Sequence, residues 1–347
     1  MLPINKNKLK KILIVDASSH YKILEQIYHL LSRHCILDYY FTNQNNYPYK
    51  LMFPSYKKVN VKIAKFKGIF IFLRVLVIGW RYHYINISTG PEHDHYSDFL
   101  RILGFYLCSL IYGKKIILTI RNLSPYKKNH NFRNFIRFKA IENIKRFSFE
   151  TDTMRINFRN NYDLKQKKHF FAVSYDRYPD AISLFKEPTK KYKKNEKKIR
   201  IGLLGSISEE RRDYDILISA LEKIDEMTRN KMELVILGAC FEGLKNKVIK
   251  RLRKYIKVHF INYVLSEEQF VVEGYSCSFL ISPLKKFYGL NKGSGSIGDA
   301  IYLQKPLIIP KSFDENYEFE EFCYYFDNKF ELYELLKSSI SGNLKLQ

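Results

Sequence analysis

Short apolar runs alternate with helix-length segments along almost the whole chain. Lys11–Asp16 is the first run, and an amphipathic segment follows it at Tyr21–Arg33. The pattern returns at Tyr84–Ser88 and, in the second half, at Lys198–Leu204 and Glu233–Leu237. Runs of Ile, Leu and Val are typical of strands that are covered on both faces, and strand–helix alternation favours βαβ units. The sequence therefore predicts an α/β protein with parallel sheets.

A lysine-rich segment interrupts this alternation near the middle of the chain. Lys186–Lys198 contains seven lysines and shows no apolar periodicity, as is typical of an interdomain linker. A chain of 347 residues is long enough for two domains that each bury their own core. We expect one doubly wound domain over residues 1–185, the linker over 186–198 and a second domain over 199–347. The last helix, Leu332–Ile340, can pack back on the first domain.

The net charge of +24 lies entirely in the N-terminal part of the chain. Residues 1–198 hold 38 Lys and Arg against 14 Asp and Glu, whereas residues 199–347 hold 21 of each. Such a field attracts a polyanion or an anionic membrane surface. Nucleic acid is the alternative, but zinc-ligand spacing, an RNP-like string and a basic helix leading into heptads are missing from the sequence. The charge therefore favours a membrane surface or an anionic substrate.

The apolar content predicts a cytoplasmic protein that lies peripherally at the inner face of the cell membrane. The first apolar run, Ile12–Val15, is too short for the core of a signal peptide. Gly68–Trp80 and Phe99–Tyr112 are interrupted by Arg74 and Arg101, and both are shorter than the roughly 20 residues of a spanning helix. The five cysteines are widely spaced, which indicates core thiols in a reducing compartment and no disulfide framework.

A basic amphipathic segment, Asn131–Arg146, allows two interpretations. Six apolar residues and five Lys or Arg share this predicted helix. It could lie on an anionic bilayer with its aromatic face buried. The alternative is an ordinary surface helix that packs on the sheet.

A glycine-rich loop lies within Ser282–Pro310, between two apolar runs. Gly289, Gly293, Gly295 and Gly298 fall in or beside it. Backbone N–H groups and a helix N-terminus can converge on a phosphate or diphosphate in a loop of this kind. The alternative is an ordinary βα connection in which the glycines serve tight turns.

Two motifs in the second half resemble those of a known family. One is Gly205-Ser206 followed by the segment Arg212–Leu217, and the other is Asp299-Ala300 shortly before Lys305–Ile308. Together with the two α/β halves they resemble GT-B glycosyltransferases of the family 4 type, the bacterial enzymes that assemble surface polysaccharides such as O-antigen. The resemblance implies two Rossmann-like domains that face each other across a cleft, with the acceptor on the first domain and the donor on the second.

The resemblance also implies a function. A metal-independent hexosyltransferase would move a sugar from a nucleoside-diphosphate sugar to a polyprenyl-diphosphate-linked oligosaccharide. The nucleotide sugar is then a co-substrate, and no cofactor is needed. Two alternatives stay open: a basic nucleic-acid-binding protein and a non-catalytic module that binds nucleotide sugars.

The donor residues follow from the same motifs. Arg212 stands where the family usually has a lysine on the donor diphosphate, and Asp299 stands at the second glutamate of the family's E-x7-E motif, which contacts the ribose. The first glutamate would fall at Asn291, so the pattern is broken there and the stereochemistry of transfer stays open. The predicted donor-binding residues are Gly205, Ser206, Arg211, Arg212, Lys292, Gly293, Ser294, Gly295, Ser296 and Asp299.

The catalytic and acceptor-side residues are predicted in the first half. His93 resembles the family's cleft-facing histidine, and Glu92 and Asp94 could hold its tautomer or act as a general base. A polar loop without catalytic duty is the alternative. Ligands of parallel sheets lie beyond the carboxyl ends of the strands. This rule adds four acceptor-side residues, which are Ser19, His20, Arg121 and Asn122.

Two patterns could suggest a metal, and neither supports one. Asp213-x-Asp215 has the form of a D-x-D motif, but it opens a predicted helix, where acidic side chains cap the N-terminus. His93-x-His95 has no evident third ligand. We therefore predict no metal site.

Overall fold

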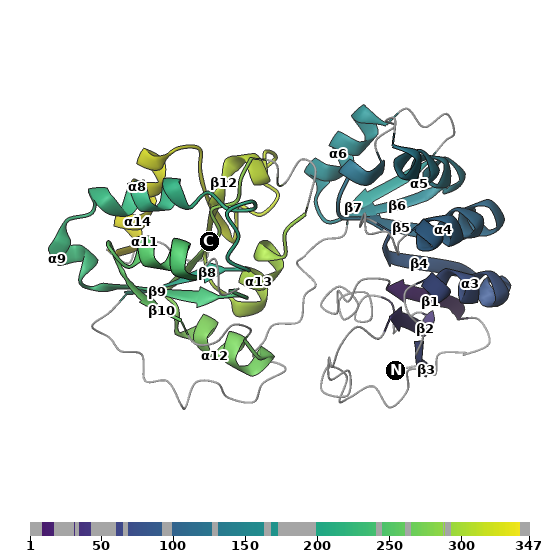
Figure 1. Ribbon diagram of the computed structural model, residues 1–347, viewed down its shortest axis with the longest axis horizontal. Coiled ribbons are helices and arrows are strands. Elements are labelled where there is room, and N and C mark those ends of the chain that lie inside the picture. Colours follow the sequence, from purple (N-terminus) through teal and green to yellow (C-terminus); the bar gives the residue numbers. More distant parts are fainter. Residues whose placement is uncertain are drawn as a thin grey trace. The chain divides into compact units, whose positions relative to one another are not determined.

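The protein separates into two compact units, Met1–Arg177 and Tyr178–Gln347 (Figure 1). Each unit is a parallel sheet with helices packed on it. The computed structural model describes residues 9–16, 31, 35–42, 60–64, 69–91, 99–126, 131–162, 168–172, 199–240, 245–260, 265–286, 288 and 293–340.

The first unit contains a seven-stranded sheet in the order β3-β2-β1-β4-β5-β6-β7. Its strands are β1 (Lys10–Asp16), β2 (Cys35–Thr42), β3 (Asn60–Ala64), β4 (Tyr84–Thr89), β5 (Ile116–Ile120), β6 (Arg146–Phe149) and β7 (His169–Ala172). The order reverses between β1 and β4, where Asp16 pairs with Thr89. In doubly wound sheets such a reversal is the point at which ligands bind, beyond the carboxyl ends of the strands.

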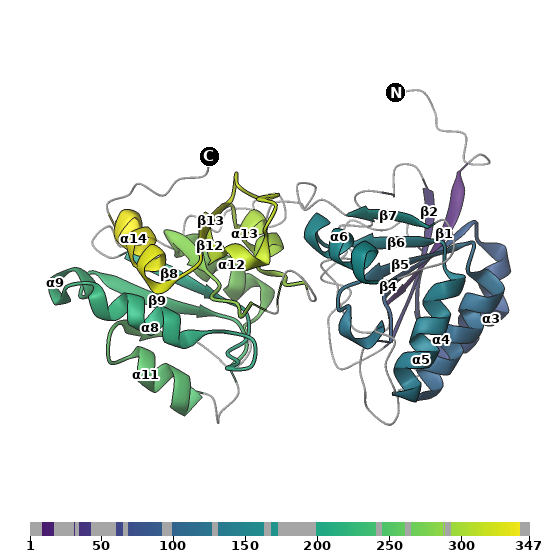
Figure 2. The ribbon, with the colours of Figure 1, turned by 90° about the horizontal axis from the view of Figure 1, so that it is seen from above.

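Three helices of the first unit lie side by side on one face of its sheet (Figure 2). They are α3 (Ile69–Ile78), α4 (Phe99–Tyr112) and α5 (Phe132–Asn143). The unit also contains η2 (Gly79–Arg81), η4 (Ser124–Tyr126) and α6 (Asp152–Asn161).

Helix α5 packs on the sheet, as the second interpretation of the basic segment predicts. Its apolar residues Ile136, Phe138 and Ile141 are buried, whereas Phe132 and Phe135 are exposed. The predicted helix is too long, because α5 ends at Asn143 and its last predicted residue begins β6.

The second unit contains a six-stranded sheet in the order β10-β9-β8-β11-β12-β13. Its strands are β8 (Ile199–Leu204), β9 (Met232–Leu237), β10 (Lys257–His259), β11 (Phe279–Ile281), β12 (Leu307–Pro310) and β13 (Cys323–Phe326). Its helices are α8 (Tyr214–Lys223), α9 (Glu226–Arg229), η7 (Lys245–Ile249), α11 (Lys250–Leu252), α12 (Glu267–Ser276), α13 (Ser296–Leu303), η8 (Lys311–Phe313) and α14 (Lys329–Ile340). The strand order reverses between β8 and β11.

The ends of this sheet's helices follow from local sequence. The Asp213 carboxylate accepts hydrogen bonds from the N–H groups of Asp215 and Ile216, both at 3.1 Å, and so caps α8. The capping interpretation of the D-x-D string is therefore confirmed.

Leu332 and Leu336 of α14 are buried in the core of the second unit itself.

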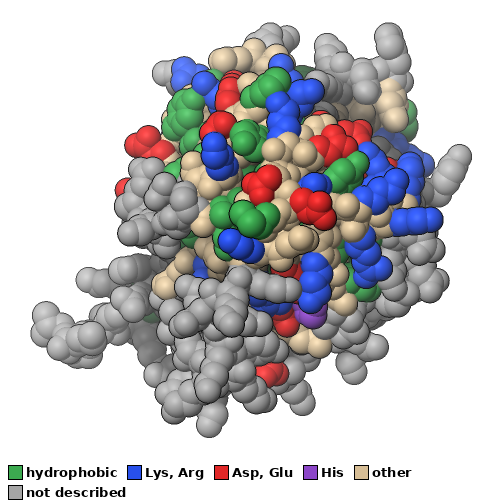
Figure 3. Space-filling model, turned by 90° about the vertical axis from the view of Figure 1, so that its left-hand side faces the viewer, with side chains coloured by type: hydrophobic (Ala, Val, Ile, Leu, Met, Phe, Trp, Pro, Cys, Tyr) green, Lys and Arg blue, Asp and Glu red, His purple; other side chains and the backbone are tan. Residues whose placement is uncertain are grey.

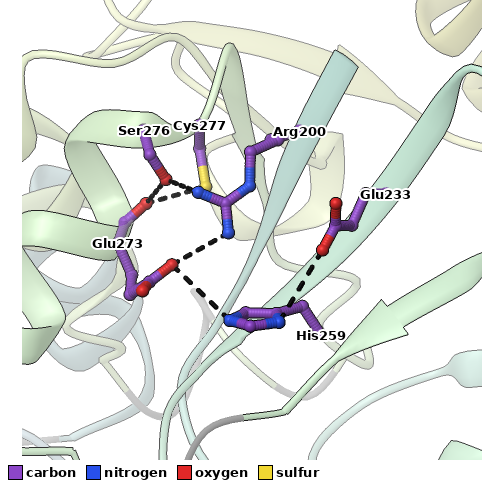
Figure 4. Close-up of polar contacts among 6 residues, drawn as sticks. All are labelled: Arg200, Glu233, His259, Glu273, Ser276 and Cys277. Carbon is purple, nitrogen blue, oxygen red and sulfur yellow. Dashed lines mark hydrogen bonds and ion pairs between the residues drawn. The ribbon is translucent and has the colours of Figure 1, made fainter. Parts of the chain in front are cut away.

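A polar cluster lies under α12 near the amino ends of β8 and β9 (Figure 4). Arg200 Nη2 lies 2.9 Å from Glu273 Oε2, and both side chains are largely buried. His259 lies between two carboxylates, 3.8 Å from Glu233 and 4.0 Å from Glu273. Because ligands of such sheets bind at the opposite, carboxyl ends of the strands, this cluster is structural.

The surface of the second unit carries charges of both signs. The face of the second unit in Figure 3 carries Lys and Arg side chains interspersed with Asp and Glu. This agrees with the balanced charge of residues 199–347.

Across the described residues, no helix has both the length and the apolar character needed to cross a bilayer.

Candidate donor-binding site

The loop after β8 is held closed by a buried arginine. Arg212 Nε donates to Leu204 O at 3.1 Å, and its Nη1 donates to Ser206 O at 2.6 Å. Between these two carbonyls lies Gly205, with a φ of +80° that favours glycine. A Cβ at Gly205 would also overlap the Arg212 guanidinium. Arg212 therefore acts as a clamp around the turn that leaves β8.

The loop after β11 is joined to this clamp through the backbone. Arg212 forms an isolated antiparallel bridge with Leu284. Asp213 N donates to Pro283 O at 2.8 Å, and Lys285 N donates to Arg211 O at 3.0 Å. Since β8 and β11 are the strands between which the order reverses, these two loops flank the ligand-binding position expected for the sheet.

Three serine hydroxyls line the start of α13. Ser282 follows β11 directly, is fully buried and lies 2.9 Å from Ser296 Oγ. Ser296 Oγ in turn lies 3.0 Å from Ser294 Oγ. A helix N-terminus carries partial positive charge, and hydroxyls beside it can donate to an anion. This is the geometry in which a phosphate or diphosphate is commonly bound.

A carboxylate lies one turn into the same helix. Asp299 is partly exposed, and its backbone N–H donates to Gly295 O at 2.8 Å. A carboxylate accepts hydrogen bonds and repels phosphate, so a sugar or ribose hydroxyl is its natural partner. The start of α13 thus offers serine hydroxyls that can donate to an anion and, within a few residues, a carboxylate that can accept from a hydroxyl.

Burial sets the electrostatics of the site. Arg212 is only 5% exposed, and this burial lowers the pKa of its guanidinium, although the neighbouring Tyr214, Tyr288 and Asp299 oppose the effect. Arginine keeps its charge in proteins. A cation in a poorly hydrated position attracts an anion more strongly than one in bulk water. Arg211 on the same loop is exposed and adds a second positive charge.

The structure gathers most of the predicted donor residues in one place. Nine of the ten are described, and all nine belong to the loops after β8 and β11 or to the first turn of α13. The tenth, Lys292, and the broken motif position Asn291 lie outside the described residues. Within the described part of the chain, no group of His, Cys, Asp and Glu side chains is arranged to hold a metal ion.

The predicted catalytic and acceptor-side residues are mostly not described. Glu92, His93 and Asp94 lie outside the described residues, and so do Ser19 and His20. Arg121 is described, and its Nε forms an ion pair with Glu150. The side chain of Asn122 accepts a hydrogen bond from Ser124 N at 3.1 Å. Both side chains therefore have partners within the first unit, and their role toward an acceptor remains a prediction.

Arg137 anchors the backbone just before the predicted catalytic loop, a role that the sequence did not indicate. Arg137 has no exposed surface, and its Nε donates to Pro91 O at 2.7 Å. The preceding Gly90 lies so close to Tyr126 that a Cβ there would overlap the phenol oxygen. These contacts fix the chain at Gly90 and Pro91, directly after β4.

Two further residues of the candidate site, Ser282 and Tyr288, were not among those predicted from the sequence. Ser282 carries a local signal, because it is a polar residue directly after a buried strand. Tyr288 is buried, which raises the pKa of its phenol, while the nearby Arg211 and Arg212 act in the opposite direction. No local pattern places Tyr288 beside Arg212, because their proximity depends on the pairing of two loops.

Solved structures with this architecture cover nearly the whole chain. The N-terminal domain of Candida albicans trehalose-6-phosphate phosphatase matches with a TM-score of 0.65 and 9% identity, over 95% of this chain and 90% of that one. UDP-GlcNAc 2-epimerase from Neisseria meningitidis bound to UDP-GlcNAc matches with a TM-score of 0.58 and 12% identity, over 95% and 91%. WaaG, a glycosyltransferase involved in lipopolysaccharide biosynthesis, matches with a TM-score of 0.59 and 11% identity, over 95% and 90%.

This is the GT-B fold. At such low identity the likeness shows the architecture alone, namely two Rossmann-like α/β domains. The predicted fold class of two Rossmann-like α/β domains is confirmed. No protein-family model matches the chain, and no curated protein sequence matches it.

Proposed function

We propose that the protein is a glycosyltransferase that takes its sugar from a nucleoside-diphosphate donor bound in the second domain. One observation carries this proposal: the loop of Arg212 pairs with the loop after β11 at Leu284, and that second loop leads to the Ser282–Ser296–Ser294 hydroxyls and to Asp299, whose charge acts on Arg212. The negative charge on the leaving diphosphate grows in the transition state, so preset cations and donors stabilise that state more than the ground state. Arg211 and Lys292 supply further charge in this proposal.

The acceptor side of the proposal rests on charge. A polyprenyl-diphosphate-linked oligosaccharide is an anion at an anionic membrane, and the positive excess of the chain lies in residues 1–198, which comprise the first domain and the lysine-rich linker. In this proposal His93, with Glu92 and Asp94, assists deprotonation of the acceptor hydroxyl, while Ser19, His20, Arg121 and Asn122 face the acceptor. The enzyme would work without a metal, at the cytoplasmic face of the membrane, in the synthesis of a surface polysaccharide by a family 4 type of transferase.

A nucleotide-sugar epimerase is the second candidate. It is favoured by the structural match to UDP-GlcNAc 2-epimerase, which has the same fold and whose structure holds UDP-GlcNAc. The two activities share a donor pocket and differ in the fate of the sugar.

The first experiment identifies the donor. Thermal unfolding is followed with UDP-, GDP-, dTDP- and CMP-sugars, and the true donor is expected to raise the midpoint, because a ligand that binds only the folded state stabilises it. Ser296→Ala and Arg211→Ala should each weaken the shift. Lys250→Ala, an exposed cation on α11, serves as the control and should leave it unchanged. A protein that responds to none of these sugars but binds DNA or RNA saturably at physiological salt would contradict the proposal.

The second experiment follows the sugar. A transferase releases nucleoside diphosphate in step with glycosylation of a lipid-linked acceptor, whereas an epimerase changes the configuration of the sugar with no acceptor present. Binding of the donor without either reaction would mean a non-catalytic module.

A further inference from the structure

The outer faces of α3 and α4 carry a layer of exposed apolar side chains. On α3 and the η2 turn after it they recur every three or four residues, which places them along one side of the helix. On α4 they are spaced by seven, three and one residues, which also keeps them on one side of the helix. We call this layer the apolar platform; it consists of Phe70, Leu73, Val77, Trp80, Leu100, Leu107, Leu110 and Ile111. Val77 and Trp80 are each 65% exposed, and Ile111 is 64% exposed.

The platform is separate from the core of the first domain. The opposite sides of α3 and α4 are already buried, and they meet in an edge-to-face contact between Phe72 and Phe105 with ring centroids 5.6 Å apart. Tyr112 also donates a hydrogen bond to Leu76 O at 2.8 Å. The two helices are thus locked together by their inner sides. Large contiguous apolar surfaces on soluble proteins mark a partner or a membrane.

The charges around the platform select an anionic partner. Arg74 and Arg81 are exposed on the α3 side of the platform, and Lys114 is exposed just after α4. The three neighbouring helices and their ends contain ten Lys and Arg and a single acidic residue, Glu142. This count covers residues 69–81, 99–115 and 131–146. An apolar centre with a cationic border complements a bilayer whose interior is apolar and whose headgroups are negative.

We infer that the apolar platform inserts into the interface of an anionic bilayer, with Arg74, Arg81 and Lys114 at the depth of the lipid phosphates. The inference rests on the proposed function, since that function brings the protein to a lipid-linked acceptor. It also moves the main membrane contact from α5, whose apolar stripe is largely buried, to α3 and α4. Trp80 at the end of the platform suits the membrane–water boundary, where tryptophan is enriched.

Trp80 makes the inference directly measurable, because it is the only tryptophan of the chain. The probe is a vesicle of equal parts phosphatidylcholine and phosphatidylglycerol, compared with pure phosphatidylcholine. With the anionic vesicles we expect the Trp80 emission to shift to the blue and to be quenched by brominated acyl chains. The shift should weaken with added salt, because headgroup attraction is screened.

A paired variant tests which side chains are responsible. Val77→Asp combined with Leu110→Asp should lower the affinity for anionic vesicles by about tenfold or more, since it places charge in an apolar contact. Both positions are exposed, so the fold is expected to survive. Met227→Asp, on α9 of the second domain and 72% exposed, is the matched control and should bind vesicles like the parent protein.

Three outcomes would overturn the inference. The first is sedimentation with vesicles and no change in Trp80 emission, which would place the contact elsewhere. The second is a dimer that Val77→Asp and Leu110→Asp convert to a monomer, with no response to lipid. The third is the absence of vesicle binding. Donor-induced thermal shifts, measured without lipid on the same samples, separate this failure from failure of the proposed function, because vesicle binding and donor binding can be lost independently.

Discussion

The two domains share one architecture but use it differently. In the second domain the loops at the strand-order reversal are tied to each other by Arg212 and by backbone hydrogen bonds, and its surface charge is balanced. The first domain carries most of the positive excess of the chain, and its α3–α4 layer exposes large apolar side chains. The difference shows that two surfaces of a Rossmann-like fold can vary independently of its core. One is formed by the loops beyond the strands, and the other by the outer sides of the helices.

The largest effect is expected from the clamp of the second domain. Arg212→Met removes the hydrogen bonds of the guanidinium to Leu204 O, which is buried, and to Ser206 O, which is partly buried. Because an orphaned buried acceptor costs about 1–3 kcal/mol, we expect the free energy of unfolding to fall by about 3 kcal/mol and the donor-induced thermal shift to vanish. Urea denaturation and the nucleotide-sugar screen measure the two effects.

Arg211→Met is the control for stability, since Arg211 is exposed and should change the free energy of unfolding by no more than about 0.5 kcal/mol. If Arg212→Met bound the donor as tightly as the parent protein, the assignment of this site would be wrong.

A smaller loss of stability is expected from Arg137, which anchors the backbone after β4 in the first domain, and this loss should leave donor binding unchanged. Arg137→Met removes the donor to Pro91 O, and we expect a loss of about 2 kcal/mol in the free energy of unfolding. Transfer should slow because the chain before Glu92 loses its anchor, whereas the donor-induced shift should persist. Arg133→Met on the same helix is the control. If Arg137→Met lost the thermal shift that the nucleotide sugar induces, the proposal that the donor binds in the second domain alone would be contradicted.

The smallest effect concerns pH and a lysine of the first domain. Lys168 Nζ donates to Glu142 O and Ile144 O, both at 2.6 Å, at the end of α5. Burial lowers the pKa of this amine to about 8. Between this value and its ordinary pKa of about 10.4, the unfolded chain binds more protons than the folded one, so stability contributed by this group rises with pH.

Compared with Lys168→Met, the parent protein should therefore gain stability from about pH 8 to about pH 10 in parallel denaturation series. Lys114→Met, at an exposed position, should show no such trend relative to the parent. A relative loss of stability over this range would show that the folded state favours the charged amine.

Much of the fold was predictable because its signals are local. The apolar runs at β1, β4, β8 and β9 were found within one or two residues of their observed ends. The elements that were missed are short or polar: β6, α6 and β13 have four, ten and four residues, and α6 is largely polar. Their formation depends on pairing with neighbouring strands or on packing against the sheet, which a short local pattern does not reveal.

The site was predictable only as a set of loops. Glycines and serines after apolar runs indicated where a ligand could bind, and the sequence order placed them in the second half. The contact of Ser282 with Ser296, and that of Arg212 with the carbonyls on both sides of Gly205, follow from how the loops close on each other.

By itself the sequence determined the two α/β halves and the confinement of the net positive charge to residues 1–198, because periodicity and composition are properties of the chain alone. Only the tertiary structure decided that Arg212 is a buried clamp and that the apolar platform faces outward. Helix α3 is apolar around most of its circumference, so its periodicity cannot tell the side that packs on the sheet from the side that remains exposed. That choice is made by the neighbouring strands and by α4.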